Sequence, residues 1–291
     1  MKNMKTHCLI TIALSVITIG HVQAQSLVGI NSNNQIGVFD SANIGAATFN
    51  NINGLGVGES LLGIDLRPSN NTIYGISTAN KLYTVDAYSG VANFAFDLTS
   101  NVAVAGKSFG VDFNPIADRG AGASLRIVSS AGDNYAVNAN NGAVTIATSI
   151  AAGYSAVAYS NSDTTQTTAP ANTRLYYINN DTDTLSVANS GFNNPTISLI
   201  GQIGFDILKA NGFEIFADGS AFAAINMDDG SLDSQLLNIN LNTGEANSIG
   251  KFNGTINGLT AAPSAVPVPA ALPLMASAIG LFGMCRRNLK A

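Results

Sequence analysis

Carboxyl side chains recur at one position of a short segment that the sequence repeats five times. The segment reads small, apolar, X, apolar, and X is in turn Asp65, Asp112, Ala158, Glu214 and Thr260. If the repeats close into a ring, these side chains lie at one level around its axis. Carboxylate oxygens are ligands that calcium prefers, and a calcium ion with an open coordination position supports hydrolysis without a histidine base. Asp65, Asp112 and Glu214 are therefore candidate metal ligands.

The same acids also have a structural interpretation. An acid beside the core of a repeat often accepts hydrogen bonds from backbone amides or pairs with an arginine of the next repeat. Four arginines are candidates for that pairing: Arg67, Arg119, Arg126 and Arg174. Because two of the five positions lack an acid, we favour the structural interpretation and expect arginines to neutralise the ring.

Short strands must position these residues. The starts of the five segments are 47, 46, 56 and 46 residues apart, and the long interval contains a Thr/Ala/Pro-rich run at 162–172 that indicates a loop insertion. A period in the forties, filled with short apolar blocks between Gly/Asn-rich turns, is typical of four-stranded propeller blades. In the clearest unit we expect strands at 62–66, 72–77, 81–86 and 91–96.

The two ends of the repeat region complement each other. Residues 27–31, 35–39 and 47–51 match strands two to four of a unit, whereas 256–261 matches a first strand alone. Joining them completes a fifth blade and leaves no open sheet edge. We therefore predict an all-β propeller of five four-stranded blades over residues 25–263, closed by its N- and C-terminal strands. A right-handed β-solenoid is the alternative.

Composition excludes several classes of site. Between residues 25 and 265 there is no His, Cys or Trp, which excludes disulfides, zinc sites built from His or Cys, and triads with a histidine base. The same stretch has 18 acidic and 8 basic residues, a net charge of −10. Because an acidic surface repels phosphate backbones, we expect no nucleic-acid partner. Beyond the candidate calcium, we expect no cofactor.

Residues 1–24 have the layout of an export signal. Lys2 and Lys5 precede an apolar stretch at 9–19, and small residues follow near Ala24. We expect signal peptidase to cut between Ala24 and Gln25.

Residues 264–291 form a second three-part signal, in which a proline motif, an apolar stretch and a basic end follow one another. The residues of this signal are Val266, Pro267, Pro269, Ala270, Ala271, Arg286 and Arg287. A helix over 270–285 would be about 24 Å long, adequate for a temporary anchor, with the basic end cytoplasmic. The tail resembles PEP-CTERM sorting signals. That resemblance implies export across the inner membrane, transient anchoring by the tail, and tail removal by an exosortase-type transpeptidase.

The body resembles a known family as well. Gly-Ile-Asp-Leu-Arg-Pro at 63–68, Lys-Leu-Tyr-Thr-Val-Asp at 81–86 and Phe-Gly-Val-Asp-Phe-Asn-Pro-Ile-Ala-Asp-Arg at 109–119 are similar to the domain-of-unknown-function 4394 family. The similarity covers most of residues 27–260, and residues 120–124 lengthen a loop relative to the family pattern. The resemblance implies a propeller-like exported protein and transfers no catalytic residue.

Together these features favour an exported, non-catalytic surface or extracellular-matrix protein that is deposited with exopolysaccharide or biofilm material. Two alternatives stay open. One is a calcium-dependent propeller hydrolase or lactonase that uses Asp65, Asp112 and Glu214. The other is a glycan- or protein-binding module that uses the channel mouth and the loop at 162–172.

Overall fold

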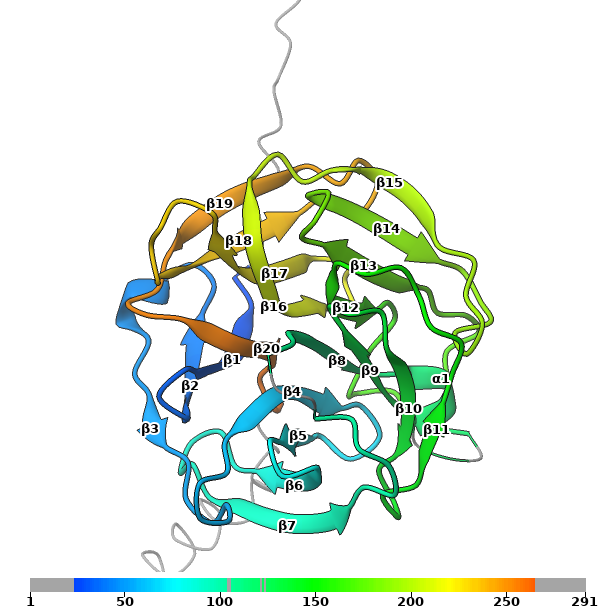
Figure 1. The fold of residues 1–291 in the computed structure, drawn as a ribbon. Coiled ribbons are helices and arrows are strands. Elements are labelled where there is room, and N and C mark those ends of the chain that lie inside the picture. Colours follow the sequence, from blue (N-terminus) through cyan, green and yellow to red (C-terminus); the bar gives the residue numbers. More distant parts are fainter. Residues whose placement is uncertain (1–23, 104–105, 121, 123, 265–291) are drawn as a thin grey trace, which may run out of the picture.

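The computed structural model describes residues 24–264 apart from 104, 105, 121 and 123. Within this range, twenty strands form five separate four-stranded antiparallel sheets, arranged as blades around a central axis (Figure 1). The predicted five-bladed propeller is confirmed. The solenoid alternative is wrong, because its strands would form continuous sheets along one axis rather than five closed blades.

Each blade runs outward from an inner strand at the axis. We number the blades from the N-terminus. Blade one contains β20 (Ile256–Ala261), β1 (Ser26–Asn31), β2 (Gln35–Asp40) and β3 (Asn50–Asn51); blade two contains β4 (Leu61–Arg67), β5 (Thr72–Ser77), β6 (Lys81–Val85) and β7 (Ala92–Asp97); blade three contains β8 (Phe109–Phe113), β9 (Ser124–Ser129), β10 (Asn134–Asn138) and β11 (Val144–Ile146); blade four contains β12 (Tyr154–Tyr159), β13 (Leu175–Asn179), β14 (Thr184–Ala188) and β15 (Ser198–Gln202); blade five contains β16 (Ile207–Ile215), β17 (Ala221–Met227), β18 (Ser234–Ile239) and β19 (Ala246–Lys251).

Blade one closes the ring with strands from both ends of the described chain. β20 pairs antiparallel with β1, from Leu27 opposite Ala261 to Asn31 opposite Ile256. This pairing hides the edges that β1 and β20 would otherwise expose. The predicted closure is therefore confirmed.

Two short helical turns depart from the predicted pattern of strands and loops. α1 (Pro115–Asp118) follows β8, and its N-cap Asn114 accepts hydrogen bonds from the backbone amides of Ile116 and Ala117. The 3₁₀ turn Ile44–Ala46 occupies the approach to β3, so the strand expected at 47–51 is reduced to Asn50–Asn51.

Small residues at the first position of the repeated segment allow the inner strands to approach one another. A Cβ atom added to Gly212 of β16 would lie 2.4 Å from the backbone nitrogen of Leu259 in β20, and one added to Gly110 of β8 would lie 2.7 Å from that of Val157 in β12. Side chains alternate along a strand, so the third position lies on the same face as the first. The repeated acids therefore face the next blade at its closest approach.

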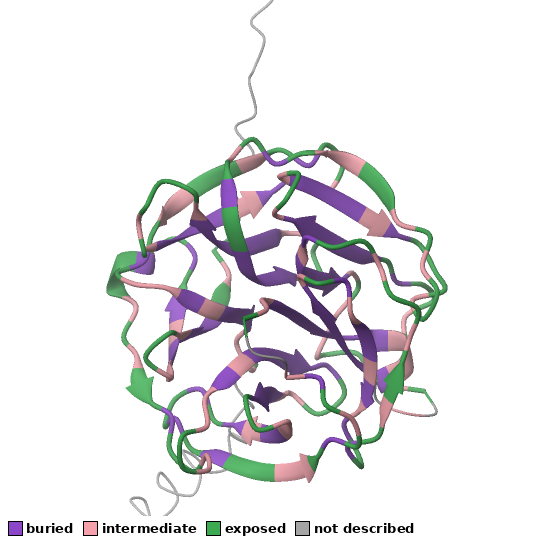
Figure 2. Cartoon of the chain, in the orientation of Figure 1, coloured by how far each residue is buried: buried purple, intermediate pink, exposed green. Residues whose placement is uncertain are grey.

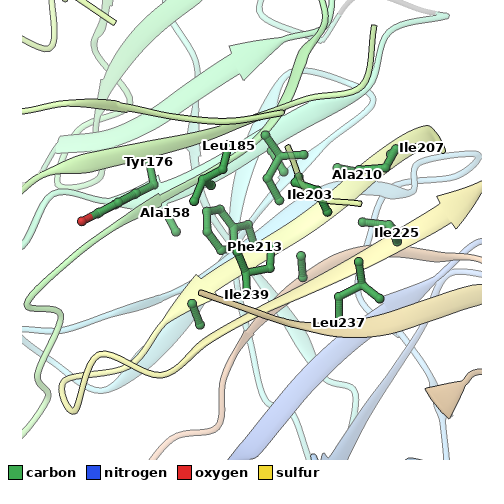
Figure 3. Close-up of a cluster of buried hydrophobic side chains, with 14 of the residues drawn as sticks. Ala158, Tyr176, Leu185, Ile203, Ile207, Ala210, Phe213, Ile225, Leu237 and Ile239 are labelled. Carbon is green, nitrogen blue, oxygen red and sulfur yellow. The ribbon is translucent and has the colours of Figure 1, made fainter. Parts of the chain in front are cut away.

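Hydrophobic side chains fill the spaces between the blades. Between blades four and five, Ala158 and Tyr176 meet Phe213 and Ile225 in one buried cluster (Figure 3). Each such large side chain contributes about 1.5–3 kcal/mol when fully buried. Inner strands are almost wholly buried, whereas outer strands are largely exposed (Figure 2). The core is thus a set of packed blade faces, and the axis is its narrowest part.

Candidate functional site

The inner strands bring the three predicted acids together at the axis. Asp65 of β4, Asp112 of β8 and Glu214 of β16 are 2–4% exposed. One carboxylate oxygen from each lies within 4.8 Å of the other two. Thr260 of β20 completes the group, and we call these four residues the axial acid ring. Whether the ring binds a metal stays a prediction.

Each member of the axial acid ring accepts a hydrogen bond from the backbone of the next blade. The amide donors are Phe113 to Asp65 (2.6 Å), Tyr159 to Asp112 (2.9 Å), Ala261 to Glu214 (2.9 Å) and Leu66 to Thr260 (2.9 Å). In every pair the donor is the residue just after the third position of its own segment. Four of the five blade junctions are therefore tied at the axis by one repeated contact, and at the fifth Ala158 has no side-chain oxygen to accept it.

Among the described residues, the ring has no basic partner. None of the ion pairs among the described residues includes Asp65, Asp112 or Glu214. Burial raises the pKa of Asp65 well above its usual range, and the Glu214 charge raises it further. Burial, together with Asp65 and Glu214, likewise raises the pKa of Asp112, and burial raises the pKa of Glu214 to about 7. Like charges this close in a dry site favour protonation.

Thr260 gives independent geometric evidence for a proton in the ring. Its hydroxyl oxygen lies 2.8 Å from Asp65 Oδ1 and 3.0 Å from Glu214 Oε2. A hydroxyl has one proton to donate, so it can satisfy only one of the two carboxylates. The second contact is a hydrogen bond only if that carboxyl is protonated and donates to Thr260. The contact pattern therefore favours at least one neutral acid.

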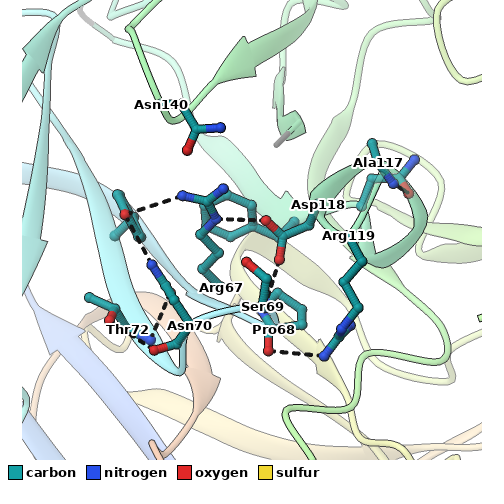
Figure 4. A network of polar contacts seen from close by, with 12 residues as sticks. Arg67, Pro68, Ser69, Asn70, Thr72, Ala117, Asp118, Arg119 and Asn140 are labelled. Carbon is teal, nitrogen blue, oxygen red and sulfur yellow. Dashed lines mark hydrogen bonds and ion pairs between the residues drawn. The ribbon is translucent and has the colours of Figure 1, made fainter. Parts of the chain in front are cut away.

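The prediction that arginines neutralise the ring is wrong for the described contacts. Arg67 pairs instead with Asp118 of α1, from Nε to Oδ1 at 2.6 Å (Figure 4). Arg119 donates to the backbone carbonyls of Pro68 and Asp163, and Arg126 donates only to neutral oxygens. Because the next blade supplies backbone amides at the right height, the acids are satisfied without a cation. The other half of the structural interpretation, bonding to backbone amides, is confirmed.

The two ends of the propeller axis differ. Where the inner strands begin, a cavity of about 250 Å³ is bordered by residues such as Leu62, Phe109 and Asn211. Where they end, a cavity of only about 30 Å³ separates Glu214 from Ser162 and Thr164. The predicted loop at 162–172 therefore lies over the end of the axis at which Glu214 borders a cavity.

Six tyrosines of the strands pack in the core. All six are at most 8% exposed, so they are not available as sugar-stacking platforms: Tyr74, Tyr83, Tyr135, Tyr159, Tyr176 and Tyr177. The hydroxyl of Tyr177 has no hydrogen-bond partner among the described residues.

Most residues of the two expected sorting signals lie outside the described residues. Ala24 is exposed, and Gln25 is the next residue, donating from its backbone to Ser41 and from its side chain to Asp218. At the other end, Ser264 exchanges two hydrogen bonds with Asn71. Cleavage after Ala24 remains a prediction. Removal of the tail, whose signal residues from Val266 to Ala271 and at Arg286 and Arg287 lie outside the described residues, also remains a prediction.

No helix within residues 24–264, with their short gaps, is long and apolar enough to cross a membrane.

Five blades of four antiparallel strands, arranged in a ring that β20 closes by pairing with β1, define this protein as a five-bladed β-propeller. The chain belongs to the family described as Domain of unknown function (DUF4394), whose model matches residues 35–260. The family resemblance read from the sequence is thereby confirmed for the body. No curated protein sequence matches the chain.

Solved structures offer distant similarities. Regucalcin from Agrobacterium tumefaciens, described as a calcium-binding protein, is 13% identical with a TM-score of 0.40, covering 83% of this chain and 75% of that one. A protein of unknown function from Bacteroides thetaiotaomicron is 12% identical with a TM-score of 0.49, covering 77% and 57%. TolB from Acinetobacter baumannii is 14% identical with a TM-score of 0.44, covering 78% and 52%. This chain thus spans little more than half of the last two.

Proposed function

We propose that the protein is an exported, non-catalytic surface or extracellular-matrix protein, sorted by its tail and deposited with exopolysaccharide. The observation that carries the non-catalytic part is the use of the axial acid ring. Its four oxygen-bearing side chains are bonded to the next blade, so the groups best suited to chemistry serve to join blades. The absence of His and Cys from 25–265 removes the commonest bases and nucleophiles.

Export and sorting rest on the two terminal sequences. The leader would be removed between Ala24 and Gln25, and the tail near Pro267, each by the enzyme that reads its three-part layout. The protein would be held in the inner membrane by its tail until an exosortase-type transpeptidase released it to the outer surface or the extracellular matrix.

Intact-mass analysis of material secreted by the native host tests this proposal. We expect a species that lacks both residues 1–24 and the basic end. A mature secreted species that still carries Arg286 and Arg287 would overturn the sorting part of the proposal.

A calcium-dependent hydrolase is the second candidate, favoured by the convergence of Asp65, Asp112 and Glu214 within 4.8 Å. All-oxygen ligands fit calcium by type, and a small cavity borders one of them, Glu214. However, calcium is bound by six to eight oxygens, and one oxygen of each ring acid already accepts a hydrogen bond from a backbone amide. These three acids would hold the ion, and its chemistry would be Lewis-acid activation of water.

Thermal unfolding with and without calcium separates the two candidates. An ion bound only by the folded state stabilises it by about 2.7 kcal/mol at a hundredfold excess over its dissociation constant. We expect no calcium-dependent rise in Tm. A rise that disappears in Asp112→Asn would favour the hydrolase.

A further inference from the structure

Arg126 of β9 is a buried cation that has no acidic partner in the described part of the chain. Its residue surface is 2% exposed, and no ion pair among the described residues includes it. The guanidinium donates to three neutral oxygens, namely Tyr159 Oη at 3.3 Å, Asn134 Oδ1 at 2.7 Å and Asn193 Oδ1 at 2.9 Å. A guanidinium has five N–H donors, so further donors remain. Burying such a charge is costly unless an anion compensates it.

The nearest acid in the sheet does not supply that compensation. Asp112 lies directly opposite Arg126 in the pairing of β8 with β9. Its carboxyl is turned instead to the backbone amide of Tyr159 and to the axial acid ring. Burial and the neighbouring acids raise the pKa of Asp112, which favours its neutral form. The positive charge of Arg126 is therefore left for another anion.

Arg126 also borders an open cleft between blades three and four. The cleft has a volume of about 580 Å³, and none of the described residues that line it is acidic, although the body carries a net charge of −10. Blade three contributes Asn114 and Ala117, and the segment between β14 and β15 contributes Gly191, Phe192, Asn193 and Asn194.

This wall of the cleft is fixed before any ligand arrives. Asn134 Nδ2 donates to the carbonyl of Phe192 at 3.1 Å, and the amide of Thr148 donates to the carbonyl of Asn193 at 2.9 Å. The Phe192 ring packs edge-on against Tyr159 at 5.0 Å. A preorganised wall reduces the entropy lost on binding.

We propose that this cleft, the Arg126 cleft, binds a carboxylate-bearing sugar unit of an acidic polysaccharide. The planar guanidinium matches a carboxylate. The Oδ1 atom of the exposed Asn193 already accepts from Arg126, so its Nδ2 group is the donor offered to sugar hydroxyls. The half-buried Phe192 ring offers an apolar surface beside it, and the volume suits one or more sugar rings.

The proposal rests on the exopolysaccharide part of the proposed function and deepens it, because it gives the propeller body a site for that ligand. It does not depend on the sorting signals, since every residue that it uses lies in blades three and four. Failure of sugar binding would leave tail processing untouched, and failure of processing would leave the cleft intact.

Calorimetric titration of the purified full-length chain tests the ligand class. The probes are the tetrasaccharide of galacturonic acid, its methyl ester and tetraglutamate. We expect the acidic tetrasaccharide to bind and the ester to bind about tenfold to a hundredfold more weakly, since a hydrogen bond to a charged group contributes about 1.5–3 kcal/mol. No binding of the acidic sugar, or equal binding of its ester, would overturn the proposal. Binding of tetraglutamate without the acidic sugar would point to a protein ligand and would also overturn it.

Variants locate the binding in the cleft. Asn194 is exposed, so Asn194→Asp should fold normally while placing a negative charge in the cleft and weakening binding at least about tenfold. The matched control Asn247→Asp changes an exposed residue of β19 in blade five and should bind as the parent does. Arg126→Lys keeps the charge but loses the planar guanidinium, so it should weaken binding. Its Tm should change less than that of a variant in which the charge is removed. Unchanged binding in Asn194→Asp would place the ligand elsewhere and refute the assignment.

Discussion

Two regions of the propeller bury carboxyl groups between neighbouring blades, the axial acid ring and the pair formed by Arg67 and Asp118. In the ring, each of the three acids accepts from its own backbone amide, and two of them also contact Thr260. No cation is among the described contacts of the ring. At the junction between blades two and three, where the inner strand β4 ends, Asp118 accepts from Arg67 Nε at 2.6 Å and from the backbone amide of Ser69 at 2.7 Å (Figure 4). Both arrangements tie a blade to its neighbour.

The difference lies in how the negative charge is compensated. Asp118 is fully buried, and its partner Arg67 also packs against the rings of Tyr74 and Phe113. Removing the carboxylate charge there leaves a buried guanidinium. In the ring, the acids gain stability by keeping protons, so replacing an acid with a neutral isostere leaves no charge behind. The same residue type therefore has opposite sensitivity to charge removal in the two regions.

The largest expected effect comes from removing the strand that closes the ring. Deleting residues 254–265 removes β20, exposes the edge of β1 and takes Thr260 out of the axial acid ring. We expect aggregation or loss of cooperative unfolding, measured by calorimetry. A deletion of similar length at 162–172 is the control, because Tyr159 and Leu175 remain paired on either side. If both deletions melt like the parent, closure by β20 contributes nothing to stability.

The second effect compares the two buried acids directly. Asp118→Asn leaves Arg67 buried without its counter-ion and should cost about 3–5 kcal/mol. Asp112→Asn should cost less than about 1 kcal/mol, because Asn Oδ1 can still accept from Tyr159 and because the raised pKa of Asp112 already favours its neutral form. Urea unfolding at pH 7 measures both.

A double variant separates the loss of charge from the loss of packing at the pair formed by Arg67 and Asp118. Asp118→Asn combined with Arg67→Met should recover part of the stability lost in the single variant, because no unpaired cation remains. Equal losses for Asp112→Asn and Asp118→Asn would contradict the distinction between the two regions.

The repeat and its closure could be predicted because they depend on local periodicity. Alternating apolar residues and Gly/Asn turns can each be recognised within a short stretch of sequence, and so can each of the two incomplete ends. The expected bounds 72–77 and 256–261 agree with the observed strands. α1 was missed although Asn114 followed by Pro115 is a helix-start signal, since a single turn has no period to detect.

The chemistry of the ring could be predicted only in part. Its acids were identifiable because they recur at one position, but their partners lie one blade away, as with Asp65 and Phe113. Whether an arginine or an amide reaches an acid depends on the height of one strand against the next, which the repeat spacing does not fix. Arg126 was considered only as a partner of the acids. Its cleft is formed with Asn193 of another blade, so no signal within β9 could reveal it.

The last and smallest effect is the pH dependence of the ring. Burial raises the pKa of Glu214 from 4.5 to about 7, so between these values the folded state binds a proton that the unfolded state has released. The resulting stability is fully present below pH 4.5 and is lost as pH rises through about 7. Between pH 5 and pH 8, the unfolding free energy of the parent should fall by roughly 2–3 kcal/mol more than that of Glu214→Gln, which cannot titrate there. Urea unfolding at both pH values measures this difference, with Glu245→Gln in the exposed turn after β18 as the control that should follow the parent. An equal decline in Glu214→Gln and the parent would show that the ring carries no proton of this kind, and the contrast with the Arg67–Asp118 pair would then rest on hydrogen bonding alone.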